Sequence, residues 1–329
     1  MEPPIDFLLI TPLADERDAV IRKINNLVKL PPIQQDTRTY YGADFQTMPS
    51  GGSGSTYRIV LLPLLNMGRV EAATATTDAL HLWQPRYVLL IGIAGGFAKS
   101  GVSLGDVLVA DKLVDYELQK LLPSAPHVRW SVHNADARLF SSAKNLTAVE
   151  WVPLVEQARP SDGRPSVHFG PVFSGDKIDA SGTTMKFLDV WPKAIGVEME
   201  AGGIGTAAFE AAKVPGVLMI RGVSDLADPN KETAQQAGWR AYACDAAASF
   251  ACGLLRSEPV PIQQSSQGES HIGKASETAE HLRETVAAAL KRLRFLELRK
   301  ASMGWDASTS LLMEIDELKK EIEAMKKQA

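Results

Sequence analysis

The sequence of 329 residues has only two cysteines and no apolar run near the roughly 20 residues that a membrane-spanning helix needs. Its first residues, Met1 to Asp6, lack the basic stretch that begins a signal peptide. Cys244 and Cys252 share one small-residue helical stretch, which is typical of core thiols in a reducing compartment rather than of a disulfide framework or a metal site. These absences predict a soluble cytoplasmic protein.

An excess of positive charge is also lacking. The 35 basic and 39 acidic residues leave a formal net charge of -4, which gives no general attraction to nucleic acid or to an anionic membrane. We therefore expect neither as a partner. With 45% hydrophobic residues, the chain can bury one substantial core and carry a second, smaller module.

Short apolar runs alternate with helical stretches along residues 5–255. The runs at residues 7–10, 57–62 and 86–96 are apolar apart from Arg58 and Arg86, as in strands that are buried on both faces. This alternation predicts a largely parallel or mixed sheet with helices on both faces.

The segment from Gln119 to Arg138 has no clear period and contains two prolines. It is predicted to be a loop or lid, and its histidines, His127 and His133, are expected on the surface.

Acidic residues follow several of the predicted strands. Glu198 and Glu200 precede a small-residue helix, Ser224 and Asp225 come just past the apolar run 216–220, and Glu16 lies in the first turn of a predicted helix. Open α/β sheets bind ligands in loops at the carboxyl ends of their strands, which favours a site. The structural alternative is that Glu16 partners a helix dipole and Asp225 caps the next helix.

Glycines mark two further places. The apolar run 86–96 ends in the pair Gly95-Gly96, which lets a ligand approach the backbone closely. The loop Gly51-Gly-Ser-Gly-Ser55 has no lysine and no phosphate-loop pattern, so it is predicted to be a linker between strands.

Five short motifs occur in a fixed order: Ile91-Gly-Ile-Ala-Gly-Gly96, Gly105-Asp-Val107, Ser174-Gly-Asp176, Gly196-Val-Glu-Met-Glu-Ala201 and Val223-Ser-Asp225. In order and spacing they resemble the superfamily of purine nucleoside phosphorylases and methylthioadenosine/S-adenosylhomocysteine nucleosidases, over roughly residues 5–255. The resemblance implies a three-layer α/β/α sandwich with a twisted mixed sheet, a homo-oligomer, a small-molecule purine nucleoside or nucleotide as substrate, and neither cofactor nor metal.

The resemblance also implies roles for individual residues. Asp225 would donate a proton to purine N7, Glu200 would accept hydrogen bonds from the ribose hydroxyls, and Met199 would pack on the sugar. Ile178 and Asp179 fall where nucleosidases stack on the base and hydrogen-bond to it, but Ile178 replaces the stacking aromatic, which leaves base preference open. Further expected substrate contacts are Ala94, Gly95, Glu198 and Ser224.

The nucleophile is predicted from the same resemblance. Phosphorylases of the superfamily hold phosphate with arginines and a serine, and the matching segments here, residues 11–15 and 90–93, contain neither. Because an anion needs such donors, phosphate is disfavoured. Glu16 matches the glutamate that activates water in the nucleosidases. A serine of the nucleosidases is replaced by Ile93, so turnover of methylthioadenosine is not implied.

The composition changes after the predicted catalytic domain, residues 1–256. Residues 257–276 are a polar, proline-containing linker, and residues 277–329 carry two apolar stripes at helical spacing, which predicts a helical hairpin. Such a hairpin docks on its own domain, self-associates or binds a partner protein. Residues 296–315 resemble adaptor helices of effectors in bacterial antiviral systems.

These patterns predict an N-glycosidic hydrolase acting on an adenine nucleoside or nucleotide, plausibly ATP or AMP, as an antiviral effector. A methylthioadenosine/S-adenosylhomocysteine nucleosidase, a phosphorolytic enzyme and a catalytically silent nucleotide-binding scaffold are the alternatives. Candidate contacts for a 5′-phosphate are Arg17, Arg69 and Lys177.

Overall fold

The structure is a computed structural model that describes residues 5–24, 26–33, 36–49, 54–120, 127–177, 183–230, 232–233, 238–262, 293, 296 and 315–320. The chain divides into two compact units, Met1–Gln263 and Gln264–Ala329. Within the second unit, the described helical stretch is residues 315–320. The predicted hairpin at 277–329 therefore lies almost entirely outside the described residues, and the predicted domain boundaries stay predictions.

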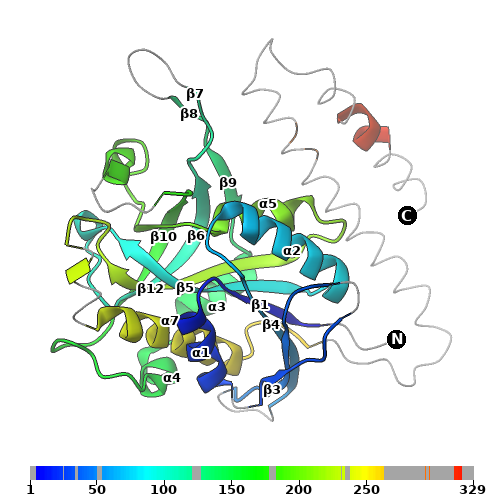
Figure 1. Ribbon diagram of the computed structural model, residues 1–329, viewed down its shortest axis with the longest axis horizontal. Helices are drawn as coiled ribbons and strands as arrows, with labels where there is room; N and C mark the ends of the chain where they lie inside the picture. Colours follow the sequence, from blue (N-terminus) through cyan, green and yellow to red (C-terminus); the bar gives the residue numbers. More distant parts are fainter. Residues whose placement is uncertain are drawn as a thin grey trace. The chain divides into compact units, whose positions relative to one another are not determined.

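One mixed sheet runs through the first unit (Figure 1). Its strand order is β11-β10-β6-β12-β5-β1-β4-β3-β2, with β9 beside β6, and β7 and β8 form a separate pair. The strands are β1 (Phe7–Thr11), β2 (Val28–Lys29), β3 (Tyr41–Gln46), β4 (Thr56–Pro63), β5 (Tyr87–Gly96), β6 (Val107–Asp115), β7 (Gln119–Lys120), β8 (His127–Val128), β9 (Ser131–Asn134), β10 (Val167–Ser174), β11 (Gly196–Glu198) and β12 (Gly216–Asp225).

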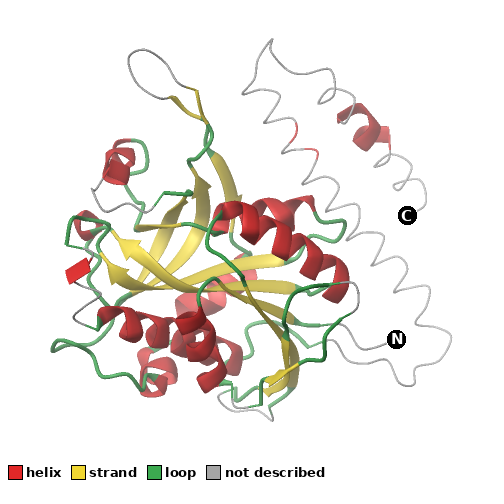
Figure 2. Cartoon of the chain, in the orientation of Figure 1, coloured by secondary structure: helices red, strands yellow, loops and turns green. Residues whose placement is uncertain are grey.

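Helices cover both faces of this sheet (Figure 2). The α-helices are α1 (Ala14–Lys23), α2 (Arg69–Trp83), α3 (Ala137–Asn145), α4 (Ala148–Trp151), α5 (Ala201–Glu210) and α7 (Trp239–Arg256), and the 3-10 helices are η1 (Ala98–Ser100), η2 (Val152–Leu154) and η3 (Thr183–Asp189).

The alternation of side chains along β1 shows how the layers are held. Phe7 and Leu9 pack in one apolar cluster with residues of α1, α3, α4 and α7, whereas Leu8 and Ile10 pack in another with residues of α2 and α5. All four side chains are fully buried. Because β1 is covered on both faces, its sequence is apolar throughout. The predicted three-layer α/β/α sandwich is confirmed.

The prediction of a loop over residues 119–138 is wrong in part. Residues 131–134 form β9, which pairs antiparallel with residues 112–115 of β6. His133 is half-buried, with its ring 6.3 Å from that of Phe209, so it does not lie free on the surface as expected. The backbone partner on β6, rather than any local period, makes this segment a strand.

Two further sequence expectations concern burial and membranes. Cys244 and Cys252 are both buried in α7 as free thiols, which confirms them as core residues. Across the described ranges, the structure contains no helix with the length and apolar character needed to cross a bilayer.

Candidate active site

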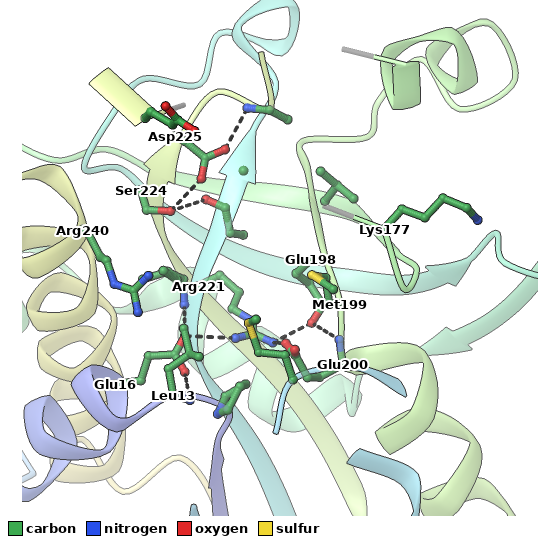
Figure 3. Close-up of a pocket in the computed structure, with 18 of the residues that line it drawn as sticks. Leu13, Glu16, Lys177, Glu198, Met199, Glu200, Arg221, Ser224, Asp225 and Arg240 are labelled. Atoms are coloured by element: carbon green, nitrogen blue, oxygen red, sulfur yellow. Dashed lines mark hydrogen bonds and ion pairs between the residues drawn. The ribbon is translucent and has the colours of Figure 1, made fainter. Parts of the chain in front are cut away.

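Three strand ends meet at one edge of the sheet. Strands β1 and β12 each pair in parallel with β5, so their carboxyl ends lie together. The chain leaves β1 for α1, which carries Glu16, while β12 ends at Asp225 and β11 ends at Glu198. A pocket of about 440 Å³ opens here. The topology thus gathers acids that are far apart in the sequence (Figure 3).

Eight of the ten predicted site residues line this pocket, and the other two, Ile178 and Asp179, lie outside the described residues. The eight are Glu16, Ala94, Gly95, Glu198, Met199, Glu200, Ser224 and Asp225. Arg221, Lys177 and Arg240 also line it, together with apolar residues that include Pro12, Leu13, Met67 and Ile93.

Arg221 joins three of the carboxylates. Its Nη2 lies 2.5 Å from Glu198 Oε2 and 2.9 Å from Glu200 Oε2, and its Nη1 lies 3.6 Å from Glu16 Oε1. The arginine is fully buried, so its charge is needed to offset part of that of the glutamates. Arg221 is a site residue that the motifs did not predict, although a lone arginine directly after the apolar run 216–220 is a signal that could have found it.

A glycine in β5 makes this meeting possible. A Cβ atom at Gly92 would lie 2.2 Å from Arg221 Nη1 and 2.4 Å from Glu16 Oε1, far inside van der Waals contact. The absence of a side chain therefore lets the guanidinium and the carboxylate approach each other past the strand.

Both oxygens of Glu16 accept hydrogen bonds from the backbone. Oε2 lies 2.6 Å from the N–H nitrogen of Leu13, and Oε1 lies 2.8 Å from that of Ile93. Burial raises the pKa of Glu16 from 4.5 to about 7, against the lowering effect of Arg221 and with a smaller raising effect of Glu200. A carboxyl group with a pKa near 7 can exchange a proton at neutral pH, which suits a general base.

Glu198 and Glu200 are held differently. Glu198 accepts the N–H groups of Glu200 and Ala201, each at 3.0 Å, at the start of α5. Glu200 accepts the N–H of Gly68 at 3.2 Å through Oε1. Burial raises the pKa of Glu200, and the charge of Arg221 opposes that rise. Glu198 is thus fixed to the start of α5, which follows it in the chain, whereas Glu200 is held from another part of the chain.

Asp225 lies at the end of β12, where the pairing with β5 shifts register between Val223 and Asp225. Its Oδ2 accepts the Ser224 hydroxyl at 3.0 Å, and its Oδ1 accepts the N–H of Ala227 at 3.0 Å. A register shift of this kind redirects a side chain relative to its strand. The carboxyl group is buried and lines the pocket, and it comes from a different strand end than the three glutamates.

Two cations besides Arg221 line the pocket. Lys177 pairs with Glu117, and Arg240 pairs with Asp15 at 2.9 Å. Of the three predicted phosphate contacts, Lys177 is therefore placed at the pocket. Arg17, which pairs with Asp18, and Arg69 are not among its lining residues. Arg240, which lies near the start of α7, was not predicted from the sequence.

Comparison with known proteins places this geometry in a family. Residues 6–256 match the model of the Phosphorylase superfamily. The chain is 28% identical over 197 residues to a death domain-containing ATP nucleosidase of Amphimedon queenslandica. The matched residues make up 56% of this chain and 36% of that relative, so the chain spans about a third of the relative's length. It is 27% identical over 220 residues to a 5′-methylthioadenosine/S-adenosylhomocysteine nucleosidase of Haemophilus influenzae, covering 64% of this chain and 84% of the relative.

Solved structures agree on the fold. The chain resembles 5′-methylthioadenosine/S-adenosylhomocysteine nucleosidase of Neisseria meningitidis in complex with methylthio-immucillin-A, with a TM-score of 0.59 and 21% identity over 77% of this chain and 99% of that one. It also resembles the futalosine hydrolase of Helicobacter pylori, with a TM-score of 0.59 and 18% identity over 76% and 97% of the two chains. The family model covers most of the chain, so the protein belongs to the Phosphorylase superfamily.

Proposed function

We propose that this enzyme is a purine nucleosidase that hydrolyses the N-glycosidic bond of an adenine nucleoside or nucleotide, releasing free base and ribose or ribose phosphate. The observation that carries the proposal is one pocket with Asp225 on one strand end and the glutamates gathered around Arg221 on others. The named relatives are nucleosidases, which supports hydrolysis of this bond.

The reaction needs charge stabilised at two places. As the C1′–N9 bond breaks, the ribose gains positive character and the base gains negative charge. Asp225 gives a proton to N7, so the base leaves neutral, and Glu200 accepts hydrogen bonds from the ribose hydroxyls. Glu16 takes a proton from the water that attacks C1′. Groups that stabilise this separation better than the ground state lower the barrier.

Water is favoured over phosphate by the charge around the cluster. The guanidinium of Arg221 already faces three carboxylates, within 3.6 Å of Glu16, 2.5 Å of Glu198 and 2.9 Å of Glu200. An incoming phosphate would meet negative charge in excess, because the one charge of Arg221 is already shared among three carboxylates. A neutral water molecule meets no such repulsion.

The 5′ substituent divides two candidate substrates. Lys177 and Arg240 place two cations at the pocket, which favours a 5′-phosphate, and the similarity to an ATP nucleosidase supports ATP. The apolar lining by Pro12, Leu13 and Met67 instead suits a 5′-thioether. The second candidate function is therefore methylthioadenosine/S-adenosylhomocysteine hydrolysis, to which other relatives point.

Free-base release tests the proposal directly. We expect mass spectrometry to detect adenine after incubation of the purified protein with ATP or AMP, equally with and without phosphate. Release from methylthioadenosine alone would establish the second candidate. A requirement for phosphate would contradict the hydrolytic mechanism, and no release from any adenine nucleoside or nucleotide would leave the scaffold alternative in its place.

A charge variant extends the same assay to the 5′ end. We expect Arg240→Ala to raise KM for ATP about threefold to tenfold, because one partly solvated cation near a phosphate is lost, and to leave KM for adenosine unchanged. Arg17→Ala is the matched control, since Arg17 pairs with Asp18 and does not line the pocket. An equal change for both substrates would refute a phosphate contact at Arg240.

The antiviral role, the oligomer and the partner protein are proposed on the sequence of residues 277–329. We expect removal of the second unit, from Gln264 onward, to change the number of subunits in the assembly, measured as molar mass by light scattering, because an amphipathic hairpin buries its apolar stripes against another surface. An unchanged number of subunits together with unchanged base release would contradict an assembly role for this segment.

A further inference from the structure

Arg69 begins α2 and holds one carboxylate with two of its own groups. Its peptide N–H donates to Asp176 Oδ1 at 2.9 Å, and its Nε donates to Asp176 Oδ2 at 3.2 Å. A third group, Nη1, donates to Asp115 Oδ2. Asp115 ends β6, and Asp176 lies just past β10. One arginine therefore fastens the start of α2 to two neighbouring strand ends.

The residue before Arg69 reaches the pocket. Gly68 donates its N–H to Glu200 Oε1 at 3.2 Å, and it has a φ of +108°, a conformation that favours glycine. Glu200 is the carboxylate that the proposed mechanism assigns to the ribose hydroxyls. The position of this N–H depends on where α2 begins, so the contacts of Arg69 bear on the orientation of Glu200.

The close packing of α2 on α5 restricts the position of the start of α2. A Cβ atom at Gly203 would lie 2.1 Å from the carbonyl oxygen of Arg69, and one at Gly202 would lie 2.8 Å from Asp115 Oδ2. Helix α5 begins directly after Glu200. The two helices are thus pressed together where α5 begins, next to Glu200, whose carboxylate accepts the N–H of the residue before α2.

The network also reaches the pocket-lining lysine. Asp176 donates its N–H to Glu117 Oε2 at 3.0 Å, and Glu117 Oε1 pairs with Lys177. Glu117 in turn donates its own N–H to Asp115 Oδ1 at 2.8 Å. The turn after β10 and the end of β6 therefore form one hydrogen-bonded unit, and Arg69 ties α2 to it.

We propose that Arg69 is a positioning residue for sugar recognition: by fixing the start of α2 on Asp115 and Asp176, it holds the Gly68 N–H where that group orients Glu200 toward the ribose hydroxyls. The inference rests on the proposed role of Glu200. A guanidinium fills this role better than an ammonium, because a lysine ammonium is a single point charge and cannot hold two carboxylates in a fixed fork.

A merely structural role would give a different result. The side chain of Arg69 is 25% exposed, and partly exposed ion pairs contribute little to stability. Misplacing a group that binds the substrate lowers turnover far more than it lowers stability. The two roles are therefore separated by how the loss depends on the hydroxyls of the substrate.

The test compares ATP with 2′,3′-dideoxy-ATP. We expect Arg69→Met to lower kcat/KM for ATP about tenfold to a hundredfold, the range for a disturbed hydrogen bond to a charged group, and to change kcat/KM for the dideoxy substrate little. Arg69→Lys should recover part of the loss. In a Glu200→Gln background, Arg69→Met should add no further loss, because the two residues act through the same contact.

Arg38→Met is the matched control. Arg38 also ties α2 to a carboxylate elsewhere, since its Nη1 lies 2.5 Å from Asp78 and 3.5 Å from Asp36, but it does not line the pocket. We expect it to lower Tm as much as Arg69→Met does without changing the preference for ATP over the dideoxy substrate. If Arg69→Met does not fold, Asp176→Asn weakens the same ion pair by changing its acidic partner. This variant should show the same dependence on the hydroxyls of the substrate.

The outcomes separate a failure of the proposed role of Glu200 from a failure of the proposed role of Arg69. Wild-type protein that releases no adenine from any adenine nucleoside or nucleotide, or that does not distinguish its substrate from the 2′,3′-dideoxy form, would overturn the role of Glu200 and the inference with it. If wild type distinguishes them and Glu200→Gln does not, but Arg69→Met and Asp176→Asn both keep the wild-type preference, the inference on Arg69 alone is overturned.

Discussion

Asp225→Asn is expected to lower kcat for base release by about 10²- to 10⁴-fold, the usual contribution of a general acid, while ligand binding persists. The amide cannot give up a proton to N7, yet it has the shape of the acid and its carbonyl oxygen can still accept the N–H of Ala227, now at 3.0 Å. Adenine release measured by mass spectrometry gives kcat. The rise in Tm on adding the substrate reports binding.

A neighbouring carboxylate provides the control for this variant. Asp228 lies in the same turn and accepts the N–H of Asn230 at 2.9 Å, and it does not line the pocket. We expect Asp228→Asn to keep wild-type kcat. If Asp225→Asn also keeps it, Asp225 is not the acid. If that variant instead loses both turnover and ligand stabilisation, the side chain acts in binding rather than in proton transfer.

Glu16→Gln is expected to abolish turnover and to change how stability depends on pH. Burial raises the pKa of Glu16 from 4.5 to about 7, so between these values the folded state holds a proton that the unfolded state has lost. Stability therefore falls as pH rises through this window. From pH 5 to pH 8 the wild type should lose on the order of 2 kcal/mol that the variant keeps.

Urea unfolding at pH 5 and pH 8 measures this difference. Taking the change between two pH values cancels the hydrogen bond that Gln loses, since both carboxylate oxygens of Glu16 accept backbone N–H groups. Asp18→Asn is the control, because Asp18 is a half-exposed acid on the same helix. Equal pH dependence in Glu16→Gln and wild type would show that Glu16 titrates in the ordinary range.

The catalytic consequence has the opposite sign. A general base must be ionised, so kcat/KM of the wild type should fall about tenfold for each pH unit below about 7. The site thus operates where Glu16 is charged and the fold is less stable. This is the expected cost of keeping a carboxylate beside Glu198 and Glu200 in a buried place.

The fold could be predicted because its signals are local. The predicted apolar runs 7–10, 86–96 and 216–220 correspond to strands β1, β5 and β12. β9 was missed because its structure comes from residues 112–115 of β6 rather than from its own pattern. A strand whose order depends on a distant partner leaves little trace in a single sequence.

The site was predictable where chemistry follows a strand end. Glu16 and Glu200 follow strands and Asp225 ends one, so sequence order alone suggested that they meet. Arg221 and Arg240 were not assigned roles. Arg221 faces three carboxylates from two other segments, and Arg240 reaches the pocket only because α7 packs beside α1. Such contacts are set by tertiary packing and have no fixed spacing.

The two buried thiols of α7 can report how often this helix separates from the sheet. Cys244 and Cys252 are each 2% exposed, and burial raises the pKa of the Cys244 thiol well above its usual range. A thiol reagent attacks only an accessible thiolate, so labelling must wait until α7 leaves the sheet. Helix α7 also carries Arg240, which lines the pocket. The ratio of labelling rates without and with substrate would therefore measure how strongly binding suppresses the opening of this side of the pocket.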